Sequence, residues 1–195
     1  YGCEGLPKEE MALFDIHFNA EGEDHREFCQ LFGPDHIIPN LGMFLDYFLI
    51  RKVMAGAGLK RSAGTVTKRL SKWLAKKGYI DEEDAKKGTE KGAAAARTLP
   101  KAERAAQMMA EDAGFFFDAS AVPDEDYLDF DHYTIAKMEP GRIWLEAFLS
   151  TDGVVGPIAV PKKATELLEE GWEISCALAR QRGKWRLVEV ADVYP

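Results

Sequence analysis

Residues 62–80 read SAGTVTKRLSKWLAKKGYI, and this stretch is the most informative part of the chain for its fold. A helix beginning at about Thr65 would carry apolar side chains at i, i+4, i+7 and i+8, which form one stripe. The residues of this stripe are Val66, Leu70, Trp73 and Leu74. Gly78 can adopt the positive φ that ends a helix, after which the chain can fold back onto the last turn. We therefore predict a short helix whose apolar stripe is buried.

A second row of side chains on this helix is basic. Lys68, Lys72 and Lys76 recur every four residues, roughly opposite the apolar stripe. The chain has a formal net charge of −8, but the charge is unevenly distributed. Residues 1–50 carry 10 acids and 2 bases, residues 51–105 carry 6 acids and 15 bases, and residues 106–195 carry 17 acids and 8 bases. Basic charge is therefore concentrated in the middle segment, which argues against a protein that coats nucleic acid over its whole surface.

The region upstream of the basic helix predicts a partner helix. Residues 41–54 are almost entirely apolar, with Asn40 as the N-cap, and predict a central helix packed on several sides. This helix, a glycine-containing turn and the basic helix together resemble a helix-turn-helix unit over residues 41–80. Residues 65–70, followed by Leu74 and Gly78, are similar to the recognition helix of winged-helix regulators. The turn is longer than the roughly 3–4 residues usual for the motif, and acidic residues 81–84 follow in place of a β-wing.

Two functions follow from the basic segment as hypotheses. The first is a nucleic-acid-binding or regulatory protein that contacts DNA or RNA through the basic helix at residues 65–77. Its candidate binding residues are Lys60, Arg61, Thr67, Lys68, Lys72 and Lys76. The alternative is a protein–protein interaction or scaffold module, in which the basic segment meets an acidic partner or the chain's own acidic flanks. No recognisable catalytic motif is present in the sequence, which favours a protein without catalytic activity but leaves an enzyme open, and we expect no cofactor.

The remaining helical region is expected to end near residue 120. Residues 86–92 are polar and contain glycine, which predicts a loop or a frayed helix end. Residues 98–100 predict a break before a helix at residues 101–112. That helix carries Ala102, Ala105, Ala106 and Met109 on one side. Residues 115–117, all phenylalanine, are expected to close the helical core.

The C-terminal third changes from helical to alternating periodicity. The predicted strands are residues 133–138, 143–149, 155–160, 172–180 and 185–190, with a helix at 162–170 and a hairpin turn at 181–184. This order is that of an OB-like barrel, with an SH3-like barrel as the alternative. We therefore predict an α+β chain, with a helical domain at residues 1–120 and a small five-stranded barrel at residues 121–195.

The predicted barrel contains aromatic and basic residues suited to a single-stranded nucleic acid. Its tryptophans are Trp144, Trp172 and Trp185, and its last hairpin carries Arg180, Arg182, Lys184 and Arg186. Aromatic rings in a cationic groove stack the bases of single strands in many OB folds. The segment is acidic overall, however, and in such a small barrel the tryptophans are more simply explained as core residues.

The cysteines and histidines do not predict a metal site. His25 and Cys29 are spaced i, i+4 on a predicted helix and Cys3 lies upstream, but no tight cysteine pair completes a zinc site. The acidic residues 123–131 lack the glycine and spacing of a calcium loop and predict a solvated linker. An odd number of cysteines, 3, fits a reducing compartment such as the cytoplasm. No apolar run is long enough to predict a membrane span.

Overall fold

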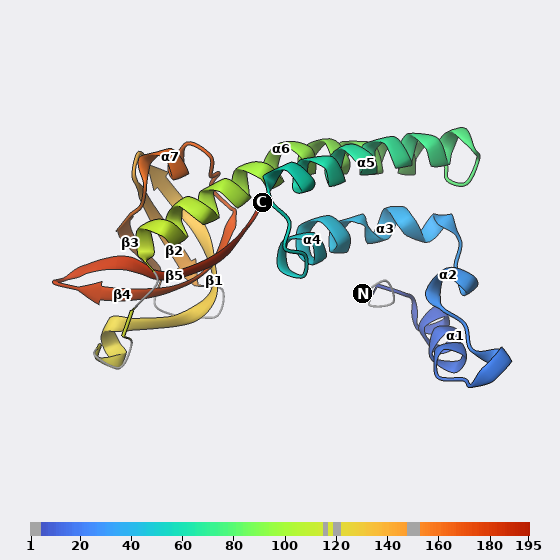
Figure 1. The fold of residues 1–195 in the computed structure, drawn as a ribbon, viewed down its shortest axis with the longest axis horizontal. Helices are drawn as coiled ribbons and strands as arrows, with labels where there is room; N and C mark the ends of the chain where they lie inside the picture. The colour runs from blue at the N-terminus through green and yellow to red at the C-terminus, as the bar shows by residue number, and fades with distance from the viewer. Residues whose placement is uncertain (1–4, 115–116, 119–121, 148–152) are drawn as a thin grey trace. The chain divides into compact units, whose positions relative to one another are not determined.

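The computed structural model describes residues 5–114, 117–118, 122–147 and 153–195, and divides the chain into two compact units (Figure 1). Unit 1 comprises Tyr1–Val53 and Arg61–Ala96, and unit 2 comprises Met54–Lys60 and Arg97–Pro195. We expected the division near residue 120. It falls earlier, inside a helix whose second half belongs with the C-terminal sheet.

The first part of unit 1 is a series of short helices. Their bounds are α1 Lys8–Phe18, η1 Gly22–Asp24, α2 Phe28–Leu31, η2 Pro34–His36, α3 Ile37–Gly42, the π-helical η3 Met43–Phe48 and α4 Leu49–Arg51. The helical segment predicted at residues 41–54 therefore begins earlier and ends at Arg51. Its buried side carries Ile38, Leu41, Leu45, Leu49 and Ile50, while Phe44 is exposed. The prediction that this segment is packed on several sides is therefore wrong for part of its surface.

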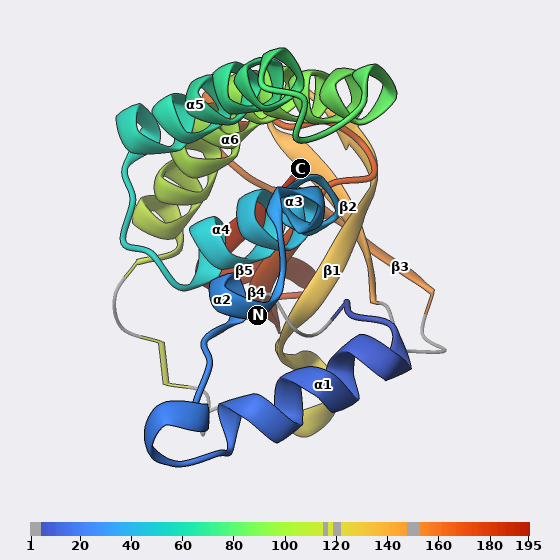
Figure 2. The same cartoon turned by 90° about the vertical axis from the view of Figure 1, so that its right-hand side faces the viewer.

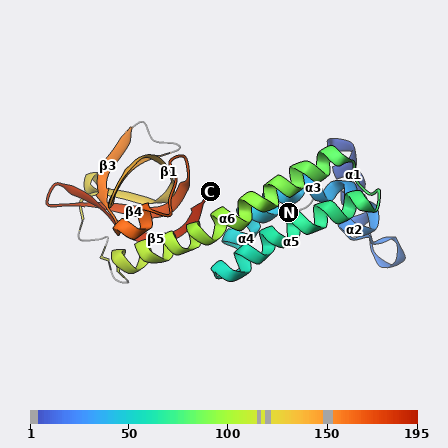
Figure 3. The same ribbon diagram turned by 90° about the horizontal axis from the view of Figure 1, so that it is seen from above.

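Two long helices follow, α5 Ala57–Lys76 and α6 Glu82–Ala113. Within unit 1, α5 and the first half of α6 run side by side in opposite directions (Figures 1 and 3). A Cβ atom placed on Gly64 would lie 2.6 Å from the Gly92 carbonyl oxygen, so the two backbones touch. The loop predicted at residues 86–92 and the break at 98–100 are therefore wrong, because α6 is continuous through both. Its glycines allow close helix packing instead of ending the helix.

This close contact changes which side of α5 is buried. Leu74 is buried as predicted, but Val66 and Trp73 are 60% and 49% exposed. The buried row instead contains Thr67 and Ser71, whose hydroxyl donates to the Thr67 carbonyl oxygen at 2.9 Å. Small side chains fill this row because the facing surface of α6 is lined by glycine and leaves little space. The prediction of one fully buried apolar stripe is therefore wrong.

The end of α5 has the predicted geometry. Gly78 has a φ of +73°, the Gly78 amide donates to Ala75 and the Tyr79 amide donates to Leu74 at 3.0 Å. This is the Schellman arrangement that satisfies the last carbonyl groups of a helix. Ile80 then packs against a small core that joins α3 to α5 and contains Ile38, Leu41 and Leu74. Figure 2 shows these two helices of unit 1, with α5 above α3 in that view.

Unit 2 contains a five-stranded antiparallel sheet, as predicted. Its elements are η5 Asp124–Asp126, β1 Tyr127–Glu139, β2 Arg142–Ala147, β3 Val154–Ala159, α7 Lys162–Thr165, β4 Glu173–Gln181 and β5 Lys184–Tyr194. The hydrogen-bonded order is β3-β2-β1-β4-β5, which leaves β3 and β5 as the two edges. These edge strands also lie close to each other. Because β1 begins at Tyr127, part of the acidic segment predicted to be a linker is strand.

The core of unit 2 lies between the sheet and the second half of α6. Ala102, Ala105, Ala106 and Met109 are buried there, as predicted, against residues such as Ile135, Leu145 and Ile174. Phe117 packs instead with Ala177, Ala179 and Val188 of β4 and β5. The prediction that residue 117 closes a helical core is therefore wrong, while residues 115–116 lie outside the described part of the chain.

Candidate nucleic-acid interface

The basic face of α5 consists of Arg61, Lys68, Arg69, Lys72 and Lys76, all of which are exposed. Successive turns of a helix bring residues at these spacings onto one side. The stretch Ala57–Lys76 contains no Asp or Glu. None of these five side chains forms an ion pair with a residue that the structure describes. The face is therefore an open row of cations about 22 Å long, given the helical rise of about 1.5 Å per residue.

Three of the four acidic residues that follow α5, namely Asp81, Glu83 and Asp84, are engaged elsewhere. The Asp81 carboxylate accepts a hydrogen bond from the Asp84 amide at 2.8 Å, which caps the start of α6. Glu83 and Asp84 pair with Lys87 at 3.0 and 3.1 Å. These contacts join residues 81–87 to one another. The acidic side chains in them therefore do not neutralise the basic face of α5.

Two of the six residues expected to bind nucleic acid are enclosed. Lys60 is only 4% exposed and forms an ion pair with Glu103 inside unit 2. Thr67 is 4% exposed and faces Gly92 across the helix contact. Arg61, Lys68, Lys72 and Lys76 remain at the surface. Arg69 belongs with them and was missed, although its spacing from Lys72 and Lys76 is the signal that places it on this side.

Exposed apolar side chains border the basic face. Val66 and Trp73 lie one helical row away from Arg69 and Lys76, and the Trp73 ring centroid is 5.8 Å from that of Tyr79. An exposed aromatic pair beside cations offers apolar area as well as charge. The surface is therefore suited to a partner that is anionic and has planar or apolar groups.

The three tryptophans of the sheet have different environments. Trp172 is buried in the core of unit 2, as expected for a structural residue. Trp144 is half-buried, with the Lys137 ammonium 4.4 Å from its ring centroid. Trp185 is half-buried, with the Arg180 guanidinium 5.8 Å from its ring, and Arg180 itself pairs with Asp126. Only Trp144 and Trp185 therefore retain exposed ring surface.

The histidines and cysteines do not converge. In the described ranges, no group of three or more His, Cys, Asp or Glu residues is placed to hold a metal ion. His25 precedes α2 and does not share a helical face with Cys29, so that prediction is wrong; the His25 ring contacts the Phe18 carbonyl oxygen. Cys3 lies outside the described residues. Cys176 is enclosed in the sheet, where burial raises the pKa of its thiol well above the ordinary value.

Comparison of the chain with protein-family models, with curated proteins and with solved structures gives no match. Among the residues that the structure describes, no helix has both the length and the apolar character that crossing a bilayer requires. The arguments for function therefore come from the geometry of the chain itself.

Proposed function

We propose that the protein binds nucleic acid, with the basic face of α5 contacting the phosphate backbone. One observation carries the proposal: Arg61, Lys68, Arg69, Lys72 and Lys76 are exposed on a helix without acidic residues and have no recorded ion-pair partner among the described residues. Like charges held side by side repel one another, and a polyanion relieves this repulsion. Phosphate contacts of this kind release counterions, which supplies affinity that is independent of sequence.

The contrast with other lysines of unit 1 supports this assignment. Lys91 pairs with Asp46, and Lys87 pairs with Glu83 and Asp84. These lysines have intramolecular acidic partners, whereas the five cations of the basic face form no ion pair with any residue that the structure describes. The basic face is therefore available to an external anion.

We also propose an OB-like arrangement for unit 2. Strand β1 pairs with both β2 and β4, α7 lies between β3 and β4 in the chain, and the edges β3 and β5 approach each other. A partly open five-stranded barrel with these connections is the OB architecture. A nucleic-acid ligand is consistent with this architecture, but the proposal for α5 does not depend on it.

The experiment uses the full chain and fluorescently labelled DNA and RNA, both single- and double-stranded, at low salt. Lys68→Glu combined with Lys72→Glu should weaken binding by at least about tenfold, because two attractive contacts become repulsive. The matched control is Lys86→Glu with Lys87→Glu, which makes the same change in net charge on α6. Absence of binding to every pool at low salt, or an equal loss in both variants, would contradict the proposal.

The exposed side chains Val66 and Trp73 favour a second candidate, a complex with an acidic protein. Apolar and aromatic residues at an exposed site contribute to protein interfaces more than isolated charges do. In this case Trp73→Ala should abolish capture of the partner, and the complex should survive nuclease treatment. Loss of the complex on nuclease treatment would favour the nucleic-acid function instead.

A further inference from the structure

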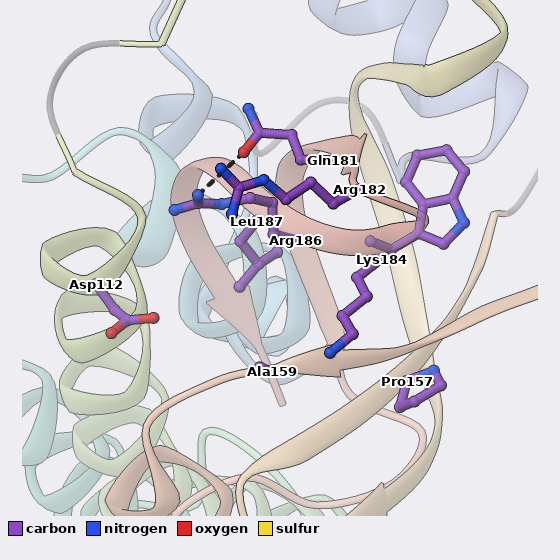
Figure 4. Close-up of a pocket in the computed structure, with 9 residues that line it drawn as sticks. Asp112, Pro157, Ala159, Gln181, Arg182, Lys184, Arg186 and Leu187 are labelled. Carbon is purple, nitrogen blue, oxygen red and sulfur yellow. Dashed lines mark hydrogen bonds between the residues drawn. The ribbon is translucent and has the colours of Figure 1, made fainter.

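Unit 2 contains an open pocket of about 770 Å³ that is separate from the basic face of α5 (Figure 4). It lies between the edge strand β3 and the β4–β5 hairpin, with Asp112 near the end of α6 on one side. Its wall on the β3 side is formed by Pro157 and Ala159. Pockets of roughly 300–1,000 Å³ are the size that small organic ligands occupy.

The pocket has a positive lining. Arg182, Lys184 and Arg186 contribute three cationic side chains, and Asp112 is the acidic residue among the lining residues. None of the three cations has a recorded ion-pair partner in the described part of the chain, whereas neighbouring Arg180 is paired with Asp126. The Lys184 side chain extends toward β3 in Figure 4, across the opening. An anion in this pocket would therefore meet cations that no acidic side chain of the described residues neutralises through an ion pair.

The hairpin holds these cations in place. Arg182 and Gly183 have φ values of 52° and 76°, so the two-residue turn has positive φ at both central positions. That is the turn whose twist matches an antiparallel hairpin, and it fixes the register of β4 and β5. The Arg186 guanidinium also donates a hydrogen bond to Gln181 Oε1 at 3.2 Å, which orients it before any ligand binds.

The apolar part of the pocket is provided by Trp185 and Leu187. Leu187 is buried in the core of unit 2, and Trp185 packs against that core while keeping part of its ring at the surface. The side chains of a strand alternate between faces, so Lys184 and Arg186 lie on the opposite face of β5 from Trp185. Because β5 is an edge strand, residues of both faces border the gap toward β3, and all three line the pocket. The pocket thus combines a fixed aromatic surface with several cations, which suits an anion attached to a planar ring.

We propose that this pocket binds a nucleotide, either free or as one unit of a single strand. Arg182, Lys184 and Arg186 contact its phosphate, and its base lies against Trp185. Asp112 accepts a hydrogen bond from a sugar hydroxyl or a base amino group. This site lies in a different unit from the basic face of α5 and uses different residues, so it goes beyond the backbone contact proposed above.

The test measures binding of adenosine diphosphate, a ten-nucleotide single strand and inorganic phosphate to the full chain at low salt. Arg182→Glu combined with Lys184→Glu should weaken nucleotide binding by at least about tenfold. The control is Lys162→Glu with Lys163→Glu, an equal change of charge at exposed positions of α7 in the same unit. Melting temperatures verify that both variants fold.

Trp185→Leu tests the base contact, since stacking on an aromatic ring is worth about 1–3 kcal/mol, or roughly 5- to 150-fold in affinity. Trp185→Phe should retain most of the affinity, which separates stacking from misfolding. Tighter binding of the ten-nucleotide strand than of the diphosphate supports a single strand as the ligand, and comparable binding supports a free nucleotide. Binding of phosphate as tightly as of nucleotide, equal loss in the control, or no binding of any probe would overturn the proposal.

The two proposals fail separately. Lys68→Glu with Lys72→Glu should leave diphosphate binding unchanged within about twofold, because the pocket residues are untouched. If the α5 variant binds every nucleic acid normally while the pocket variant does not, the pocket proposal stands and the α5 proposal is rejected. If the pocket variant binds every probe normally while the α5 variant loses nucleic-acid binding, the pocket proposal is rejected and the α5 proposal stands.

Discussion

The backbones of Gly64 and Gly92 lie against each other where α5 meets α6. A Cβ atom on Gly92 would be 2.7 Å from the Gly64 carbonyl oxygen and 2.6 Å from the Lys68 amide nitrogen. No side chain can move aside to relieve these two contacts, because both involve backbone atoms. The interface therefore depends on glycine, and the same contact leaves the basic face of α5 directed outward.

Gly92→Ala should destabilise unit 1 for this reason. Alanine is the better helix former by about 1 kcal/mol, but forcing the two helices apart costs about 1–3 kcal/mol or more. We expect a net loss of about 1–2 kcal/mol in the free energy of unfolding, measured by urea denaturation. Gly42→Ala is the control, since its nearest neighbours would be at 3.6 Å or beyond. A Gly92→Ala protein as stable as the Gly42→Ala protein would show that the helices separate freely.

The sequence predicted the sheet of unit 2 better than the helices of unit 1. Apolar residues alternate in the sequence of β4, which predicts a strand because strand residues alternate between two faces. The strand is present, but both of its faces are buried from Ile174 to Ala179. In α5 the pattern was ambiguous. Val66 and Trp73 belong to the predicted apolar stripe, but the face that is buried is set by the glycines of α6, which belong to another helix. Sequence periodicity within one helix carries no information about such a partner.

The residues of the candidate sites also fall into those that could be predicted from the sequence and those that could not. Lys68, Lys72 and Lys76 could be predicted to lie at the surface because their spacing is local. The burial of Lys60 could not, since it depends on Glu103 of another helix. The pocket at β3 and the β4–β5 hairpin also escaped prediction, although its cations were noted, because it forms where strands distant in sequence approach each other.

Leu74→Ala and Val66→Ala should separate the buried and exposed sides of α5. Leu74 is 2% exposed, and removing such a side chain costs about 2–5 kcal/mol. Val66 is largely exposed, so its replacement should change the free energy of unfolding by less than about 0.5 kcal/mol. Denaturant unfolding of both variants measures the difference. Equal destabilisation by the two substitutions would contradict the observed packing.

Lys60 should act on stability and not on nucleic-acid binding. Lys60→Met removes the partner of Glu103 and should cost about 1–3 kcal/mol, because the remaining carboxylate is partly shielded from water. Adding Glu103→Leu should recover most of this loss, since no unpaired charge remains. Affinity for nucleic acid should stay within about twofold in the double variant. If the double variant were stable but bound nucleic acid much more weakly, Lys60 would have to be a nucleic-acid contact.

His36 should make unit 1 more stable in mild acid. Its Nε2 atom lies 2.9 Å from Glu10 of α1, and this hydrogen bond, with the nearby Asp35 carboxylate, raises the pKa of His36 above 6.5. The stabilising contribution of the ion pair is therefore complete below about pH 6.5 and disappears as the pH rises through the raised pKa. Melting temperatures between about pH 5.5 and 8.5 measure the effect. The Glu10→Gln variant should lose most of this pH dependence, and an unchanged profile in that variant would refute the assignment.

The basic face of α5 also predicts a specific salt dependence of nucleic-acid binding. Each phosphate contact contributes about 0.9 to the slope of log K against log salt on duplex DNA, or about 0.7 on a single strand. Lys72→Ala should therefore reduce the magnitude of the slope by about that amount, with a smaller loss of affinity at high salt than at low salt. Val66→Ala alters the same helix without removing charge and should leave the slope unchanged. Because folding defects lower the active fraction without altering the slope, an unchanged slope for Lys72→Ala would exclude this lysine from the phosphate contacts even where its affinity falls.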